Sequence, residues 1–204
     1  MKIALLLGAT TILAIANNSC TNSNDVKELE KSLKELEKKS EEVNYVEQSN
    51  DSVDFYMILP EYLAATTGLD EGQPYQYMNA VKEQYLVASY ENIAEVKPLL
   101  NVMNYEGDTF LDKYTSFKKE IVNEGIAISK QESVKKLTIN GLPARTMQFD
   151  GTVEGIIQPI SYFAAIIEGK ENIYFVILWT LESRKEEFKD IADKIIKSFR
   201  VKKK

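Results

Sequence analysis

Histidine is absent from this chain of 204 residues, and cysteine occurs once, as Cys20. Without histidine, the chain lacks the usual general base near neutral pH and the commonest metal ligand. A single cysteine excludes an internal disulfide, a thiolate zinc cage and a Cys–His pair. No nucleophile elbow, phosphate-binding loop or dinucleotide fingerprint occurs in the sequence. We therefore expect a non-catalytic protein that uses no metal and no cofactor.

An excess of basic residues is missing as well. The chain has 25 basic and 31 acidic side chains, for a net charge of −6. Nucleic acid is not an expected partner, because phosphate binding requires clustered lysine and arginine. Hydrophobic residues make up 44% of the chain and aromatic residues 10%, which is enough for the core of one ordinary domain.

The N-terminus has the pattern of an export signal. Lys2 is followed by the apolar run Ile3–Ala16, which is shorter than the ~20 apolar residues of a membrane-spanning helix. Residues 1–19 resemble a bacterial lipoprotein signal, in which a small residue precedes the lipid-bearing cysteine. The resemblance implies that Cys20 is lipidated and holds the protein on a membrane of the cell envelope, with the outer membrane favoured. The alternative is simple secretion after cleavage behind Ala16.

Residues 20–52 are interpreted as a polar tether and a charged helical stalk. Apolar residues recur at three- and four-residue steps between Val26 and Val43, which places them on one side of a helix. The seam has fewer than three full heptads, which is short for an autonomous coiled coil. A stalk is therefore favoured over an oligomerisation helix.

The remaining range, 53–204, has the pattern of one α+β domain. The segments 61–79 and 91–107 contain proline or glycine and are expected to be loops, and Asp150-Gly151 is expected to mark a bend. Helices are expected from Asp108 or Thr109 and from Ser183. Strands are expected at 53–59, 83–90, 134–139, 144–149, 160–167 and 173–179.

Two apolar strands predict the centre of the domain. Ile160–Ile167 and Ile173–Trp179 are apolar almost throughout, which is typical of strands covered on both faces. The last helix begins with the capping-box pattern Ser183–Glu186 and has an apolar stripe that ends at Phe199. This order of elements predicts an antiparallel sheet sandwiched between helices.

Several segments of this domain resemble the PsbP-like fold. They are the strand exit "LPEYL", the turn "NGLPA", the hairpin "EGKENIYFVILWT" and a final helix that ends in "KSF". This fold is known from the extrinsic protein of photosystem II, a Ran-binding nuclear import factor and bacterial envelope lipoproteins such as DcrB. The resemblance implies an adaptor or chaperone-like role in binding an envelope protein or a small ligand.

Tyrosines in the expected loop 61–79 are the candidate partner-binding residues, namely Tyr62, Tyr75 and Tyr77. Tyrosine combines a broad contact area with a polar tip and is enriched in recognition surfaces. On this hypothesis, replacing all three leaves the fold intact and abolishes partner capture. The alternative interpretation places these rings in the core. A second functional class, an envelope hydrolase that uses carboxylate, lysine or tyrosine groups, requires a pocket with two ionisable groups of displaced pKa.

Overall fold

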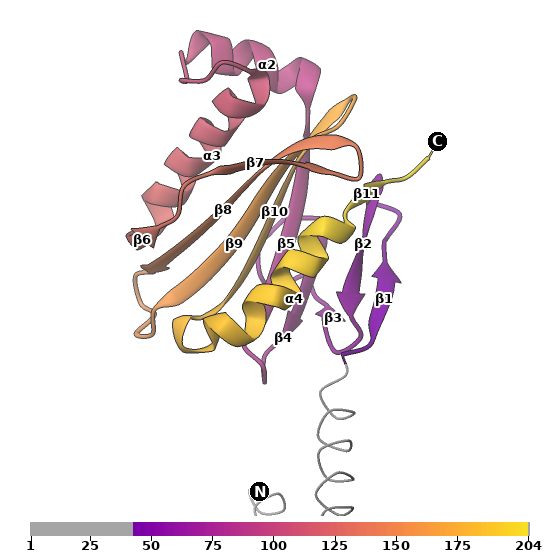
Figure 1. The fold of residues 1–204 in the computed structure, drawn as a ribbon, viewed down its shortest axis with the longest axis vertical. Helices are drawn as coiled ribbons and strands as arrows, with labels where there is room; N and C mark the ends of the chain where they lie inside the picture. The colour runs from indigo at the N-terminus through magenta and orange to yellow at the C-terminus, as the bar shows by residue number, and fades with distance from the viewer. Residues whose placement is uncertain (1–42, 204) are drawn as a thin grey trace, which may run out of the picture. The chain divides into compact units, whose positions relative to one another are not determined.

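The computed structural model describes residues 43–203, which form two antiparallel sheets and three α-helices (Figure 1). The large sheet has the strand order β3-β4-β5-β10-β9-β8-β6, and β7 also pairs with β8. Its strands are β3 (Ala64–Ala65), β4 (Tyr75–Asn79), β5 (Gln84–Asn92), β6 (Ala127–Gln131), β7 (Lys135–Ile139), β8 (Leu142–Thr152), β9 (Ile160–Glu168) and β10 (Asn172–Leu181).

The hairpin of β9 and β10 lies at the centre of this sheet, as its uniform apolar sequence predicts. Strand β10 pairs with β5 on one side and with β9 on the other, and β9 pairs in turn with β8. Every residue of β9 except Glu168 is buried. Such burial requires cover on both faces, and this requirement explains why neither strand alternates between apolar and polar residues.

A second, small sheet contains β1 (Tyr45–Gln48), β2 (Phe55–Pro60) and β11 (Arg200–Val201), in the order β1-β2-β11. Strand β1 lies within the range 20–52 that the sequence interpretation assigned to the tether and stalk. It is held by main-chain pairing along β2, where Tyr45 faces Pro60 and Gln48 faces Met57. Main-chain pairing has no strong sequence signature in a four-residue edge strand, so the pattern of apolar residues did not reveal it.

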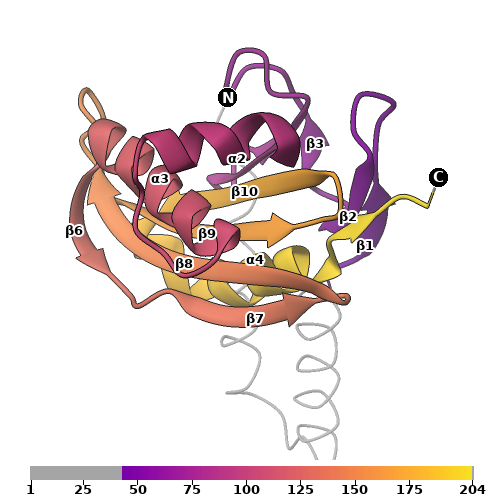
Figure 2. The same ribbon diagram turned by 90° about the horizontal axis from the view of Figure 1, so that it is seen from above.

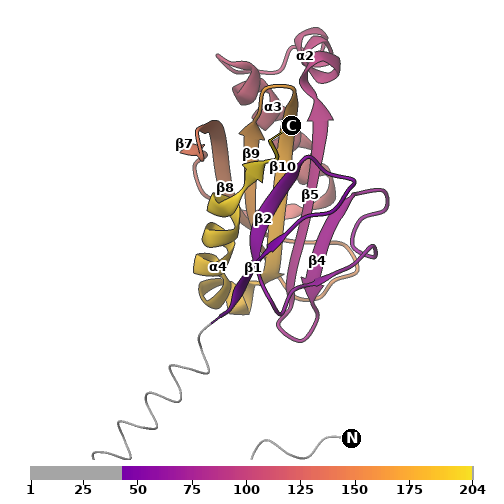
Figure 3. The same cartoon turned by 90° about the vertical axis from the view of Figure 1, so that its right-hand side faces the viewer.

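Three α-helices cover the large sheet from both faces (Figures 2 and 3). The helices are α2 (Ile93–Val102), α3 (Phe110–Gly125) and α4 (Lys185–Ser198), and a short 3-10 helix, η1 (Glu182–Arg184), precedes α4. Helices α2 and α3 lie on one face, whereas α4 and the small sheet lie on the other. The predicted α+β sandwich is therefore confirmed for residues 43–203. The expected N-terminal helix lies outside the described residues.

Each face of the sheet has its own apolar core. On the α4 face, β2 and α4 pack against β4, β5, β9 and β10, with Phe55, Tyr174 and Phe199 in mutual ring contact. On the other face, Leu111 and Tyr114 of α3 and Leu100 of α2 pack against β8 and β9. The sheet therefore carries two cores, one on each face.

Two segments that the sequence indicated as loops contain regular structure. Residues 91–107 include α2, which begins where the Asn92 side chain accepts a hydrogen bond from the amide of Ala94. Pro98 has no amide hydrogen to donate to the carbonyl of Ala94, four residues earlier in the helix. The helix tolerates this loss because Ala94 is exposed to water. Residues 61–79 include β4, which pairs with β5 along its whole length.

The structure also differs from expectation at one predicted bend and at one predicted helix cap. Strand β8 runs straight through Asp150-Gly151, because Gly151 permits the close approach of β6: a Cβ there would lie 2.8 Å from the carbonyl oxygen of Ala127. The capping box at Ser183 does not form, since η1 occupies that position and α4 begins after Arg184 without a side-chain cap. The predicted cap at Thr109 does form, with its hydroxyl accepting from the amide of Asp112 at 3.1 Å.

Candidate functional site

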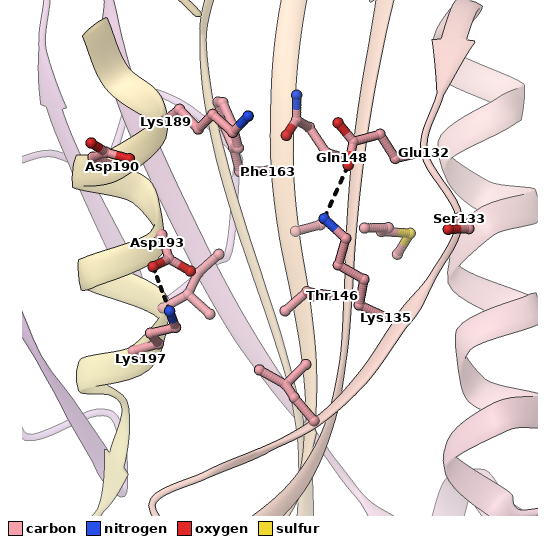
Figure 4. Close-up of a pocket in the computed structure, with 14 residues that line it drawn as sticks. Glu132, Ser133, Lys135, Thr146, Gln148, Phe163, Lys189, Asp190, Asp193 and Lys197 are labelled. Atoms are coloured by element: carbon pink, nitrogen blue, oxygen red, sulfur yellow. Dashed lines mark hydrogen bonds and ion pairs between the residues drawn. The ribbon is translucent and has the colours of Figure 1, made fainter. Parts of the chain in front are cut away.

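A groove of about 290 Å³ runs along the α4 face of the large sheet (Figure 4). One wall is α4, and the other is the segment from Glu132 to Leu137, which leads from β6 into β7. The floor is formed by Thr146 and Gln148 of β8 and by Phe163 of β9. This volume lies just below the ~300–1,000 Å³ that ligand pockets usually have.

Hydrogen bonds tie the two walls together beyond one end of the groove. The turn between β7 and β8 has Asn140 and Gly141 in the left-handed region, with φ of 48° and 86°. The Asn140 side-chain amide donates to the carbonyl of Lys197 at 2.9 Å and to that of Phe199 at 2.8 Å. The turn thus satisfies carbonyls at the end of α4, which a helix leaves without partners.

A buried ion pair holds α4 beyond the other end. Lys185 donates to both carboxylate oxygens of Asp150, at 2.9 and 2.8 Å, and Ser161 donates to Asp150 at 2.6 Å. The side chains of Asp150 and Lys185 are 3% and 15% exposed. Thr180 lies opposite Ser161 in the strand pairing, and its buried hydroxyl has no partner among the described residues. Helix α4 is therefore fixed to the sheet at both ends, and the groove between them is preorganised.

The trio Ser161, Lys185 and Asp150 contains residue types that a serine hydrolase can use. Nucleophilic catalysis requires a base that takes the serine proton and an opening for the substrate. Here the Ser161 hydroxyl and the Lys185 ammonium both donate to Asp150, so neither acts on the other. Ser161 is also completely buried. In this geometry the trio holds α4 on the sheet.

Most charged groups along the groove are already paired. Lys135 pairs with Glu132 at 3.1 Å, and Lys197 pairs with Asp193 at 2.6 Å. Lys189 has no hydrogen-bond or ion-pair partner within residues 43–203. The buried Nε2 of Gln148 likewise has no acceptor there. A buried donor without an acceptor costs about 1–3 kcal/mol, so the Gln148 amide is a position where a bound group would relieve a cost.

The structure places the three candidate tyrosines in different surroundings from those expected. Tyr75 and Tyr77 lie on β4 and are 0% and 5% exposed, with their rings 4.8 Å apart. Only Tyr62 lies between strands, where its hydroxyl donates to Gln84 at 2.7 Å. The hypothesis of an exposed Tyr75 and Tyr77 is therefore wrong, because these rings fill the core between β2 and β4. The alternative interpretation, core packing, describes both.

The ionisation of these tyrosines reflects their burial. Desolvation raises the pKa of Tyr62 to about 12, and repulsion from Tyr45 and Glu187 adds to the shift. Burial also raises the pKa of Tyr75 and of Tyr77. All three phenols stay neutral near pH 7, and none of them lines the groove.

The groove residues were not singled out by the sequence analysis, although one signal was available. Thr146, Gln148 and Asp150 alternate along β8 with the apolar residues Met147 and Phe149. Such alternation indicates a strand with one polar face. The polar face of β8 lies on the same side of the sheet as α4. It therefore indicates that apolar side chains of α4 do not cover this part of the sheet.

Some predictions lie outside the described residues, namely the signal at 1–19, lipidation of Cys20, cleavage behind Ala16 and the stalk between Val26 and residue 42. Among residues 43–203, no helix has the length and apolar content needed to cross a membrane. The same residues contain no group of three acidic, histidine or cysteine side chains placed to hold a metal ion.

Solved structures show what this fold resembles. The chain superposes on cyanobacterial PsbP from Synechocystis sp. PCC 6803 with a TM-score of 0.54 and 13% identity, covering 78% of this chain and 94% of that protein. It superposes on the Ran-binding protein Mog1p of Saccharomyces cerevisiae with a TM-score of 0.52 and 10% identity, covering 78% and 96%. No protein-family model and no curated protein sequence matches the chain. The structural likenesses show that the chain has the PsbP-like fold, as the sequence resemblance implied.

Proposed function

We propose that this protein is a lipid-anchored, non-catalytic binding module of the bacterial cell envelope, which holds a protein or small ligand in the groove beside α4. The observation that carries the proposal is a concave site with unpartnered polar groups between two walls that are fixed in place. Preorganisation of this kind favours binding because little conformational entropy is lost when the ligand enters.

The two walls of the groove are held in different ways. Helix α4 is held by Asn140 beyond one end and by Asp150 beyond the other, so its distance from β8 is set by the fold itself. The segment from Glu132 to Lys135 is more exposed and is joined to β8 by the amide of Glu132, which donates to the Gln148 carbonyl at 2.9 Å. A ligand in this groove contacts one rigid helix and one exposed segment.

The alternative function, an envelope hydrolase, gains little support from the described residues. The ionisable groups whose pKa is raised are tyrosines, and burial or a neighbouring carboxylate is the cause. Ser161, which contacts the Asp150–Lys185 pair, is buried and donates to Asp150. A non-catalytic role is therefore favoured.

Site-specific photo-crosslinking in the native envelope tests the groove. A photoreactive phenylalanine analogue in place of Ser133, on the exposed wall, should give a discrete adduct with a partner or small ligand. The same analogue in place of Asn123, on the exposed side of α3, is the matched control and should not give that adduct. Thr146→Phe, which fills the floor of the groove, should reduce the Ser133 adduct. Equal adducts from both positions would contradict the proposed site.

The membrane anchor is tested separately. Mass spectrometry of the mature protein should find an acylated N-terminal Cys20, and Cys20→Ser should release the protein from the membrane fraction. Acyl chains supply ~0.8 kcal/mol of membrane affinity for each buried methylene, so loss of the modification should have a large effect on partitioning. An unmodified N-terminus at Asn17 would show simple secretion instead.

A further inference from the structure

Two hydrogen-bond donors without protein partners face the same part of the groove. In Figure 4 the ammonium group of Lys189 on α4 points toward the side-chain amide of Gln148 on β8, next to Phe163. Gln148 pairs with Phe163 in adjacent strands, and Phe163 contacts Phe188, the neighbour of Lys189, at 5.9 Å between ring centroids. The fold itself therefore brings the two donors together from α4 and β8.

The carboxylates of the groove do not satisfy these donors. Glu132 is paired with Lys135, and Asp193 is paired with Lys197. Asp190 lies on the side of α4 turned away from Gln148 in Figure 4. Lys189 is thus the cation of the groove that has no carboxylate partner within residues 43–203.

We propose that Lys189 and Gln148 form a subsite for the carboxylate of a bound ligand, a specification that rests on the proposed function of the groove. One carboxylate oxygen accepts from the Lys189 ammonium, and the other accepts from Gln148 Nε2 once the side chain turns this nitrogen, which is buried in the free protein, into the groove. The hydrogen bond between the Lys189 ammonium and the carboxylate joins two ionised groups, and such bonds are among the strong ones. The Gln148 amide gains the acceptor that it lacks in the free protein.

The charge of the site favours a carboxylate over a phosphate. Lys189 is the one lysine of the lining without a partner among the described residues, and three carboxylates, Glu132, Asp190 and Asp193, line the same groove. A doubly charged phosphate would therefore be compensated less well than a singly charged carboxylate. The apolar part of the ligand has Leu137, Phe163 and Ile196 to contact. The free C-terminus of a peptide and a small carboxylic acid share this chemistry, and the volume of about 290 Å³ admits either.

The test uses the full chain and two blocked peptides, acetyl-Ala-Ala-Leu with a free carboxylate and the same peptide as its C-terminal amide. Binding is followed by NMR through the side-chain amide signals of Gln148, with butyrate as a third probe. We expect the free acid to bind about tenfold more tightly than the amide, which corresponds to ~1.4 kcal/mol. If butyrate competes as well as the peptide acid, the source is a small carboxylic acid; if it does not, the source is a peptide C-terminus.

Three variants locate the effect. Lys189→Met and Gln148→Leu should each abolish the preference for the acid over the amide. Lys194→Met removes the same charge from the same helix outside the groove, and it should preserve the preference. Far-ultraviolet circular dichroism of each variant shows whether the fold is retained.

Three results would overturn the subsite. They are equal affinity for acid and amide, no shift of the Gln148 signals with any probe, and an unchanged preference in folded Lys189→Met. Failure of the subsite alone leaves a groove that still forms the Ser133 adduct, whereas failure of the proposed function removes that adduct. The two failures are therefore distinguishable.

Discussion

The two faces of the large sheet are covered by helices that are held in different ways. On one face, Phe188, Ala192 and Ile195 of α4 are completely buried, and an ion pair with an almost inaccessible carboxylate fixes the helix start. On the other face, α2 buries only Leu100 fully and leaves Leu99 60% exposed. Helix α4, which forms a wall of the groove, is thus held more tightly than α2, whereas α3 buries four residues, as α4 does.

The ion pairs show the same contrast. Asp150 and Lys185 are 3% and 15% exposed, whereas Asp112 and Arg145 on the α3 face are 17% and 11% exposed. Asp112 is also near Lys136, at 3.8 Å. Water therefore reaches the acidic partner on the α3 face, and losing the basic partner there should cost less.

The largest effect should come from the core of the α4 face. Tyr75→Ala removes a ring that is 0% exposed and lies 5.1 Å from Phe55. We expect a loss of about 3–5 kcal/mol in the free energy of unfolding, as for other buried aromatic residues. Leu99→Ala, on exposed α2, should change it by about 0.5 kcal/mol or less. Urea denaturation of both variants measures the contrast, and similar losses would show that the faces do not differ.

The buried ion pair should give the next largest effect. Lys185→Met leaves Asp150 as an unpaired carboxylate under α4, and we expect a loss of about 3 kcal/mol. Arg145→Met should cost about 1–2 kcal/mol, because Asp112 keeps the Thr109 hydrogen bond and more contact with water. Both are measured by urea denaturation at neutral pH.

A double variant checks the reason for the loss. Adding Asp150→Leu to Lys185→Met removes the stranded charge, so stability should recover substantially. If the double variant is no more stable than Lys185→Met, the stranded carboxylate is not the cause.

The smallest effect should be the acid dependence of the α3 face. Desolvation of Asp112 opposes ionisation, but hydrogen bonds from Thr109 and Arg145 and the nearby cations outweigh it and lower the pKa below 3.8. A lowered folded-state pKa adds stability above the unfolded-state value, and this stability is lost as pH falls through the folded-state pKa. Asp112→Asn should therefore flatten the decline in stability below about pH 4.

The measurement is the urea midpoint of each protein across the acidic range. Asp108→Asn replaces an exposed carboxylate just before α3 and serves as the matched control. Its urea midpoint should fall with decreasing pH as steeply as that of the wild type. An unchanged slope in Asp112→Asn would show that this carboxylate does not contribute.

Sequence reasoning found the elements that have a strong apolar pattern or a local hydrogen bond. The β9–β10 hairpin, the Asn140-Gly141 turn and the Thr109 cap all follow from residues within a few positions of one another. It missed α2, which contains Pro98 and has few apolar residues facing the core, and it missed β1, which depends on distant β2. Neither carries enough local information to separate it from a loop.

The candidate site was harder to predict than the fold. Tyr75 and Tyr77 looked like surface residues because glycine and proline precede them, yet pairing with β5 draws them into the core. Lys189 and Gln148 looked unremarkable, since each lies in an element whose other residues explain the pattern. They line one groove only because α4 packs on β9 and β10, beside β8.

By itself, the sequence determined the class of fold, the central hairpin, the apolar stripe of α4 and the absence of histidine and thiol-pair chemistry. These properties depend on composition and on neighbours along the chain. Tertiary structure alone decided which tyrosines are buried, that Ser161 is closed off beneath α4, and that the unpartnered Lys189 and Gln148 line one groove. Those properties depend on residues far apart in the chain, and their relative positions are set only when the helices pack onto the sheet.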